Sequence, residues 1–263
     1  MSERINWTSR LGFILASAGA AVGLGAIWKF PYLAGSNGGS AFLFPYLVLS
    51  FTIGLTLVIA EITLGRLGKG GIVTAYRTIA GKGWTVFGYL GILTGFCVLC
   101  FYSAIGGWTI SYFIDALLGN GIVTDVSELN AHFGALVSNP YISIGYQAAF
   151  LFLTAWVVLF DVAKGIERLN KILMPLLFVL VLILIVRGMT LPGAEKGIAY
   201  LFAWKPETFT WQSLLAAMGF TFFSLCVGCG CMLTYGSYLS KDTNLLTGCS
   251  WITFLATFSS ILG

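Results

Sequence analysis

Charged side chains are scarce in this chain of 263 residues, because Asp, Glu, Lys and Arg together make up only 9% of it. A soluble domain carries about 25%. Hydrophobic residues make up 58% of the chain, so the composition excludes an ordinary water-soluble domain and indicates a protein that crosses a lipid bilayer several times. The net charge of +4 is small for such a length and gives no reason to expect a nucleic acid partner.

Histidine is the rarest of the residues that commonly carry catalysis, with a single example at His132. The sequence also lacks a Ser-His-Asp set, a cluster of metal ligands and a glycine-rich phosphate loop. We therefore do not expect a membrane enzyme, and we predict neither catalytic residues nor an organic cofactor. His132 itself falls in a polar loop and is expected to be a solvated surface residue.

Cysteine is absent from the loops predicted to lie outside the cell, which excludes an external disulfide framework. The six cysteines fall in apolar stretches, at Cys97, Cys100, Cys226, Cys229, Cys231 and Cys249. Cys226, Cys229 and Cys231 could suggest a site for a soft metal ion. With no histidine nearby, we favour the packing role that small residues have in membranes.

Long apolar runs dominate what is present. A helix needs about 20 apolar residues to span a bilayer, and seven candidate spans lie near 11–35, 41–65, 84–118, 142–160, 170–189, 211–239 and 245–263. We treat residues 1–263 as a single transmembrane domain.

Lys and Arg alternate between the loops that join these spans. They occur at the amino terminus and in the second, fourth and sixth loops, whereas the first and third loops have none and the fifth has Lys196 and Lys205, with Arg187 at its edge. The positive-inside rule then predicts a multi-pass protein of the inner (plasma) membrane with a cytoplasmic amino terminus.

Two of the spans are interrupted by the same glycine pattern. Residues 21–25 read Ala-Val-Gly-Leu-Gly and residues 226–230 read Cys-Val-Gly-Cys-Gly. Each glycine costs about 1 kcal/mol inside a helix, and a broken helix persists in a membrane only where it faces protein, water or a ligand. The glycines could instead be packing notches between helices. Their occurrence in both halves favours a binding site near the bilayer midplane, so we expect 19–25 and 223–229 to be non-helical and to adjoin.

Several further motifs resemble those of the neurotransmitter:sodium symporter family, and the resemblance extends over the whole chain. They are the run from Trp7 to Pro31, Asn37-Gly38-Gly39, the segment Lys164 to Arg168, Met174-Pro175, Thr234-Tyr235 and Ser240-Lys241-Asp242. The resemblance implies an all-α membrane protein with a leucine-transporter-like inverted-repeat fold. The chain would hold the first repeat (spans 1–5) and the start of the second (spans 6 and 7), with spans 1 and 6 broken, and would be truncated on its carboxyl side.

The resemblance also implies sodium-coupled amino-acid symport with one or two sodium ions. The residues it assigns to the substrate are Ala20, Ala21, Gly23, Leu24, Gly25, Val98, Tyr102, Phe223, Ser224, Cys226 and Cys229. Those assigned to sodium are Gly19, Ala21, Val22 and Ser224, and those assigned to the gates are Arg4, Trp7, Lys29, Tyr102 and Phe223. Glu61 is an acid inside a span, and we expect it to support the site by hydrogen-bonding the backbone of a broken helix.

The chain departs from the family where Ala26, and by a less certain register Ala256, replace asparagines that supply oxygen to the first sodium site. Cys229 stands where a relative selective for small aliphatic amino acids has phenylalanine, so we expect a bulky or aromatic substrate such as tyrosine. The alternative interpretation is a non-transporting ligand-binding or regulatory membrane protein, or an inactive fragment.

Overall fold

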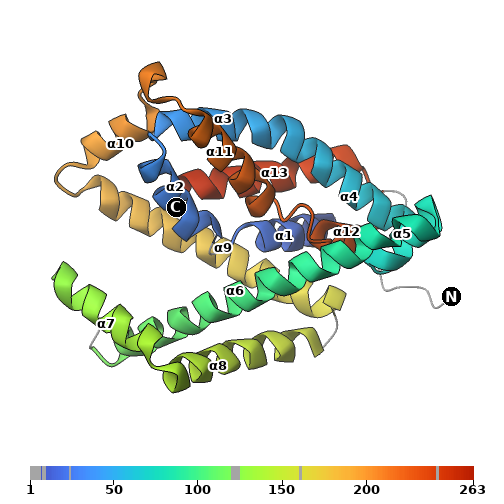
Figure 1. Cartoon of the computed structure of the whole chain (residues 1–263), viewed down its shortest axis with the longest axis horizontal. Coiled ribbons are helices and arrows are strands. Elements are labelled where there is room, and N and C mark those ends of the chain that lie inside the picture. The colour runs from blue at the N-terminus through green and yellow to red at the C-terminus, as the bar shows by residue number, and fades with distance from the viewer. Residues whose placement is uncertain (1–6, 8–9, 24, 120–124, 160–161, 241–242) are drawn as a thin grey trace. The chain divides into compact units, whose positions relative to one another are not determined.

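The computed structural model describes residues 7, 10–23, 25–119, 125–159, 162–240 and 243–263, and every regular element in these ranges is a helix (Figure 1). They divide into two compact units. The first unit comprises Met1–Ile92 together with Ile166–Gly263, and the second comprises Leu93–Gly165. The helix α6 (Thr85–Leu117) begins in the first unit and continues into the second, and α9 (Val162–Met189) returns the chain to the first.

The first unit contains most of the helices. In chain order they are α1 (Arg10–Ala21), η1 (Gly25–Lys29), α2 (Phe30–Ser36), α3 (Ser40–Leu49), η2 (Ser50–Gly54), α4 (Leu55–Gly68), α5 (Ile72–Ala80), η3 (Lys82–Trp84), α10 (Ala194–Phe202), η4 (Pro206–Thr208), α11 (Trp211–Ser224), α12 (Cys231–Gly236) and α13 (Leu245–Leu262). The elements η1 and η2 are single turns of π-helix. Because η2 joins α3 to α4 without a gap, the three form one long rod in Figure 1.

The second unit consists of the later part of α6, α7 (Val126–Ser138) and α8 (Pro140–Leu159). His132 lies here on α7 with 43% of its side chain exposed, as expected of a surface residue, and its Nε2 is 3.5 Å from Asp115 Oδ2. Gln147 Nε2 donates to Ser103 Oγ at 2.8 Å and ties α8 to α6 inside the unit.

Five of the seven predicted spans appear as helices long and apolar enough to cross a membrane. They are Ser40–Gly68, Lys82–Leu117, Pro140–Leu159, Gly165–Met189 and Leu245–Leu262. The first predicted span is a bent pair, in which Leu11–Ala21 and Gly25–Ser36 meet at 44°. The sixth is divided into α11 and α12 by a turn over residues 225–230. Both spans predicted to be broken are therefore broken.

The position of the first break differs from the prediction. Gly19, Ala20 and Ala21 are the last helical residues of α1, and the regular helix is interrupted only after Ala21. A Cβ atom added to Gly19 would overlap the Asn170 side-chain oxygen, so this glycine is a packing notch for α9. In the stretch 223–229, which was also predicted to be non-helical, Phe223 and Ser224 are helical and are the last residues of α11.

The segments predicted as loops are partly helical. The stretches 66–83, 119–141 and 190–210 contain α5, α7 and α10. The predicted span 170–189 is the later part of α9, which begins at Val162, earlier than hydropathy indicates, and Pro175 therefore lies well inside the helix. In the part of α9 before the predicted span, Glu167 is only 2% exposed and accepts a hydrogen bond from Lys171 Nζ at 2.7 Å.

Aromatic packing surrounds the second half of the first broken span. Phe30 on α2, Phe42 and Tyr46 on α3, and Phe220 on α11 are all buried, and their ring centroids lie 5.1–6.1 Å apart. Such rings bury large apolar areas and prefer tilted contacts at these distances. The cluster therefore fixes α2 and α11 against α3 next to both breaks.

Candidate functional site

The two chain breaks touch each other. The chain leaves α1 through Val22, whose N–H donates to Ala18 O at 2.6 Å. It leaves α11 through a turn in which Cys226, Gly228 and Gly230 have φ values of 53°, 87° and 75°. The Cys226 thiol donates to Ala20 O at 3.3 Å, which confirms the prediction that the two stretches adjoin.

Two helix carboxyl ends converge at this contact. The last turn of an α-helix has carbonyl groups without intrahelical donors and carries partial negative charge. The last turn of α1 contains Gly19 and Ala21, and that of α11 contains Phe223 and Ser224. The turn uses part of this capacity, since Cys226 N donates to Phe223 O at 3.2 Å. The arrangement favours a cation or an ammonium group.

Ser224 is the polar side chain nearest the end of α11. It is 2% exposed, and its hydroxyl donates to Thr221 O at 3.3 Å within the same helix. A hydroxyl donating to a carbonyl keeps its oxygen lone pairs for another partner. The side chain is thus compatible with the sodium role that the sequence predicts.

Glu61 holds the second break from α4. Its Oε1 accepts the Gly228 N–H at 2.6 Å, and its Oε2 is buried without a hydrogen-bond partner among the described residues. This is the bond to a broken helix backbone that we expected. It satisfies a donor that lost its helical partner, which is costly to leave unpaired in an apolar environment.

Two of the residues that the resemblance assigns to the gates, Trp7 and Lys29, make contacts near the two breaks from different elements. The Trp7 indole Nε1 donates to Tyr235 O at 3.1 Å, and its ring packs edge-on against the Tyr235 ring of α12. Lys29, in η1, places its Nζ 4.4 Å from the centre of the Phe223 ring. Both contacts join the chain near the first broken span to the second.

The other predicted residues are distributed over several parts of the chain. Arg4 and Leu24 lie outside the described residues. Val98 and Tyr102 lie on α6 in the second unit, where the Tyr102 ring meets Phe101 edge-on. Gly23 accepts the N–H of Ala26 at 3.0 Å, and Gly25 begins η1 and is buried.

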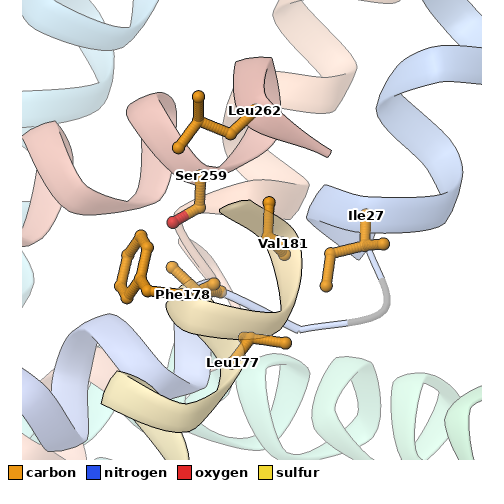
Figure 2. Close-up of a pocket in the computed structure, with 7 residues that line it drawn as sticks. Ile27, Leu177, Phe178, Val181, Ser259 and Leu262 are labelled. Carbon is orange, nitrogen blue, oxygen red and sulfur yellow. The ribbon is translucent and has the colours of Figure 1, made fainter. Parts of the chain in front are cut away.

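Methyl groups occupy the two positions where family asparagines were expected. Ala26 and Ala256 are both fully buried. Close by, Ile27, three residues of α9 (Leu177, Phe178 and Val181), Ser259 and Leu262 line a cavity of about 10 Å³ (Figure 2). This space is close to that of one water molecule, so it is too small for an amino acid.

Sequence reasoning did not single out the polar face of α13. Thr253 and Thr257 are buried, and neither hydroxyl has a hydrogen-bond partner among the described residues. Their spacing of four residues places them on one helix face. The spacing of the two threonines is visible in the sequence, but their apolar neighbours give the whole segment a high hydropathy, so hydropathy alone does not indicate a polar face.

Comparison with known proteins identifies the family. Residues 4–123 and 142–263 match the model of the sodium:neurotransmitter symporter family. The chain belongs to this family. Among curated symporter relatives, it is 39% identical over 248 residues to an uncharacterized sodium-dependent transporter of Bacillus subtilis, YhdH, covering 93% of this chain and 55% of that protein. It is 31% identical over 299 residues to the human sodium-dependent neutral amino acid transporter SLC6A17, covering 99% and 40%.

A solved structure matches the fold. The crystal structure of MhsT in complex with L-phenylalanine superposes with a TM-score of 0.92 at 42% identity, covering 99% of this chain and 59% of that one. The leucine-transporter-like fold predicted from the sequence is thereby confirmed. The chain spans about half the length of the curated relatives it matches.

Proposed function

We propose that this chain carries the solute and ion site of a sodium-coupled amino-acid symporter. The observation that supports it most is the contact of the two broken helices through Cys226 Sγ and Ala20 O. Broken spans that meet in corresponding halves are the usual site of substrate and coupling ion in this class of transporter.

In this proposal the backbone binds both ends of a zwitterion. The N–H groups of Gly23, Leu24 and Gly25 receive the carboxylate. The first N–H groups of a helix have no partner inside it and point toward its amino-terminal end, so those at the start of η1 would face the break. The carbonyls of Ala21, Phe223 and Ser224 receive the ammonium group.

Sodium is held by carbonyls at the same helix ends. One site uses Gly19 and Val22, and the other uses Ala21 together with Ser224. Because ion and amino acid share Ala21 and Ser224, each stabilises the arrangement that the other needs, which is the origin of coupling.

The finer proposal is a bulky or aromatic substrate, with tyrosine as the first candidate. The pocket wall would comprise Val98, Tyr102, Phe223, Cys226 and Cys229. A thiol at position 229 leaves space for a ring, and burying a ring contributes roughly 25 cal/mol per Å² of its area. L-phenylalanine in the MhsT complex supports an aromatic ligand for a chain this similar.

The gates would close around this site. Lys29 stacked on Phe223 and Tyr102 would form the outer gate, and Trp7 with Arg4 the inner one. This direction follows from an inner-membrane placement with the amino terminus in the cytoplasm, as the alternating basic loops indicate.

Uptake of labelled amino acid by proteoliposomes tests the function. An inward sodium gradient should drive accumulation, and an equal potassium gradient should not. Binding of the amino acid without any sodium-driven accumulation would overturn symport and favour the non-transporting alternative.

Competition tests the substrate class in the same vesicles. Tyrosine, phenylalanine and tryptophan should displace labelled ligand at lower concentration than glycine, alanine and leucine. Stronger displacement by the small amino acids would contradict the enlarged pocket but leave symport standing.

A further inference from the structure

Two pairs of cysteines in the chain share the spacing Cys-x-x-Cys but differ in local structure. Cys97 and Cys100 lie within the regular helix α6. Cys226 and Cys229 lie in the turn between α11 and α12. All four are free thiols, and Cys226 and Cys229 are partly exposed.

The turn brings the second pair together. Cys226 and Gly228 both have positive φ, so the backbone between the two cysteines is not a regular helix. Cys229 Sγ donates to Cys226 O at 3.1 Å, which places the Cys229 thiol beside the backbone of Cys226. In a regular helix, by contrast, the Cβ atoms of residues three apart are held about 5–6 Å from each other, which is longer than the roughly 3.5–4.5 Å that a disulfide needs.

The turn over residues 225–230 is fixed by a hydrogen bond and still has free space beside it. Glu61 Oε1 anchors the Gly228 N–H at 2.6 Å, between the two cysteines. A Cβ atom added to Gly228 would meet nothing within 4 Å, so the backbone there has space to adjust. The third cysteine nearby, Cys231, lies outside this turn as the first residue of α12.

We propose that Cys226 and Cys229 form a redox-active dithiol that hydroperoxides convert to an intramolecular disulfide. Redox-sensitive cysteines are accessible and have a resolving cysteine beside them, and this pair meets both conditions. One sulfur attacks the peroxide O–O bond and becomes a sulfenic acid, releasing an alcohol or water. The second sulfur attacks the sulfenic sulfur, and the hydroxyl leaves as water. In balance, two thiols and one hydroperoxide give one disulfide, one alcohol and one water.

Oxidation would act directly on the contact between the broken helices. A disulfide removes the Cys226 S–H that donates to Ala20 O, and it closes a short ring over residues 226–229. The turn becomes rigid where the proposed transport cycle requires movement. Oxidation should therefore stop uptake, and reduction should restore it. This second effect rests on the proposed function, whereas disulfide formation does not.

Peptide mass spectrometry tests the chemistry on the whole chain in micelles. The protein is treated with tert-butyl hydroperoxide, its remaining thiols are alkylated with iodoacetamide, and it is digested. We expect Cys226 and Cys229 to escape alkylation, so that their peptide lacks two hydrogens and carries a single alkyl group, on Cys231, with reversal by dithiothreitol. Cys97 and Cys100 are the internal control and should remain alkylated. Alkylation of Cys226 and Cys229 after peroxide, a link to Cys231, or equal oxidation of the Cys97–Cys100 pair would overturn the proposal.

Variants separate the dithiol from general damage. The double variant Cys97→Ser/Cys100→Ser and the single variant Cys231→Ser should still form the 226–229 disulfide. Uptake by Cys229→Ser, measured against its own reduced sample, should lose its sensitivity to peroxide. If the disulfide forms but uptake by the parent chain is unchanged by it, the regulatory consequence is wrong. If no uptake occurs in the reduced parent chain, the proposed function fails and the disulfide result still decides the dithiol.

Discussion

At the scale of single residues, Glu61 is the side chain whose contact the sequence predicted most directly. An acid between apolar neighbours in a span needs a donor, and the structure supplies the Gly228 N–H at 2.6 Å. Which donor it meets could not be predicted, because that depends on the turn over residues 225–230, where Cys226 takes a positive φ despite having a side chain.

Two substitutions of Glu61 distinguish the effect of its size from the effect of its hydrogen bond to the Gly228 N–H. Glu61→Gln keeps an oxygen for the Gly228 N–H, whereas Glu61→Leu leaves that donor unpaired. We expect Glu61→Leu to lower the free energy of unfolding by about 1–3 kcal/mol more than Glu61→Gln. Thermal unfolding of both variants in the same detergent measures the difference, and equal midpoints would show that the bond contributes little.

The prediction about sodium binding at this scale concerns the Ser224 side chain. Ser224→Ala removes one oxygen ligand, so the sodium concentration for half-maximal uptake should rise about tenfold, or ~1.4 kcal/mol. Substrate affinity at saturating sodium should change much less. Sodium titration of uptake makes the measurement.

Two controls define that result. Ser224→Thr keeps the hydroxyl and should titrate like the parent chain. Ser213→Ala, at the other end of α11, removes a hydroxyl that bonds Asn37 O and Thr210, and it should leave the sodium titration in place. A Ser224→Ala chain with an unaltered sodium titration would exclude the side chain from the ion site.

At the scale of helices, hydropathy located the spans because a bilayer imposes a minimum apolar length. It located the breaks less well. Gly19 lies against the Asn170 side chain, and α1 remains helical as far as Ala21. Of the three glycines in residues 19–25, the first therefore serves close packing between helices, and only the later two belong to the interruption of the α-helix. The π-helical turns η1 and η2 escaped prediction, because a change in hydrogen-bond register leaves no hydropathy pattern.

The prediction about helix packing compares two glycines, one in close contact with a neighbouring helix and one in open space. Gly65 on α4 lies against α12, where an added Cβ would overlap Leu233 O. Gly219 on α11 has nothing within 4 Å of its added Cβ. Gly65→Ala should destabilise the protein by about 1–3 kcal/mol through overpacking. Gly219→Ala should stabilise it by up to about 1 kcal/mol through helix propensity.

Thermal unfolding of the two alanine variants decides this point, since the chemical change is identical. Opposite shifts of the midpoint are expected. Two shifts of the same sign would mean that propensity or lipid contact, rather than the approach of α4 to α12, determines the outcome.

At the scale of the whole molecule, the proposed symport raises the question of how many sodium ions would move with each amino acid. Ala26 and Ala256 are fully buried and present methyl groups where the family resemblance implies side-chain oxygens. A sodium ion prefers oxygen ligands and is costly to bury without them. The sodium site that we propose on Ser224 and the carbonyls of α1 does not depend on either position, so we expect one coupled ion rather than two.

The accumulation ratio at zero net flux measures that number. With the membrane potential clamped to zero, a sodium gradient of about tenfold supplies ~1.4 kcal/mol for each coupled ion. One ion therefore supports at most about tenfold accumulation of a neutral amino acid, and two ions support about a hundredfold. We expect the lower plateau and a Hill coefficient near one for sodium. Ala26→Asn would offer the missing oxygen and should raise the Hill coefficient if the rest of the first site is intact. A parent protein that accumulates its substrate well beyond tenfold under the clamp would mean that a second ion is bound without these side chains.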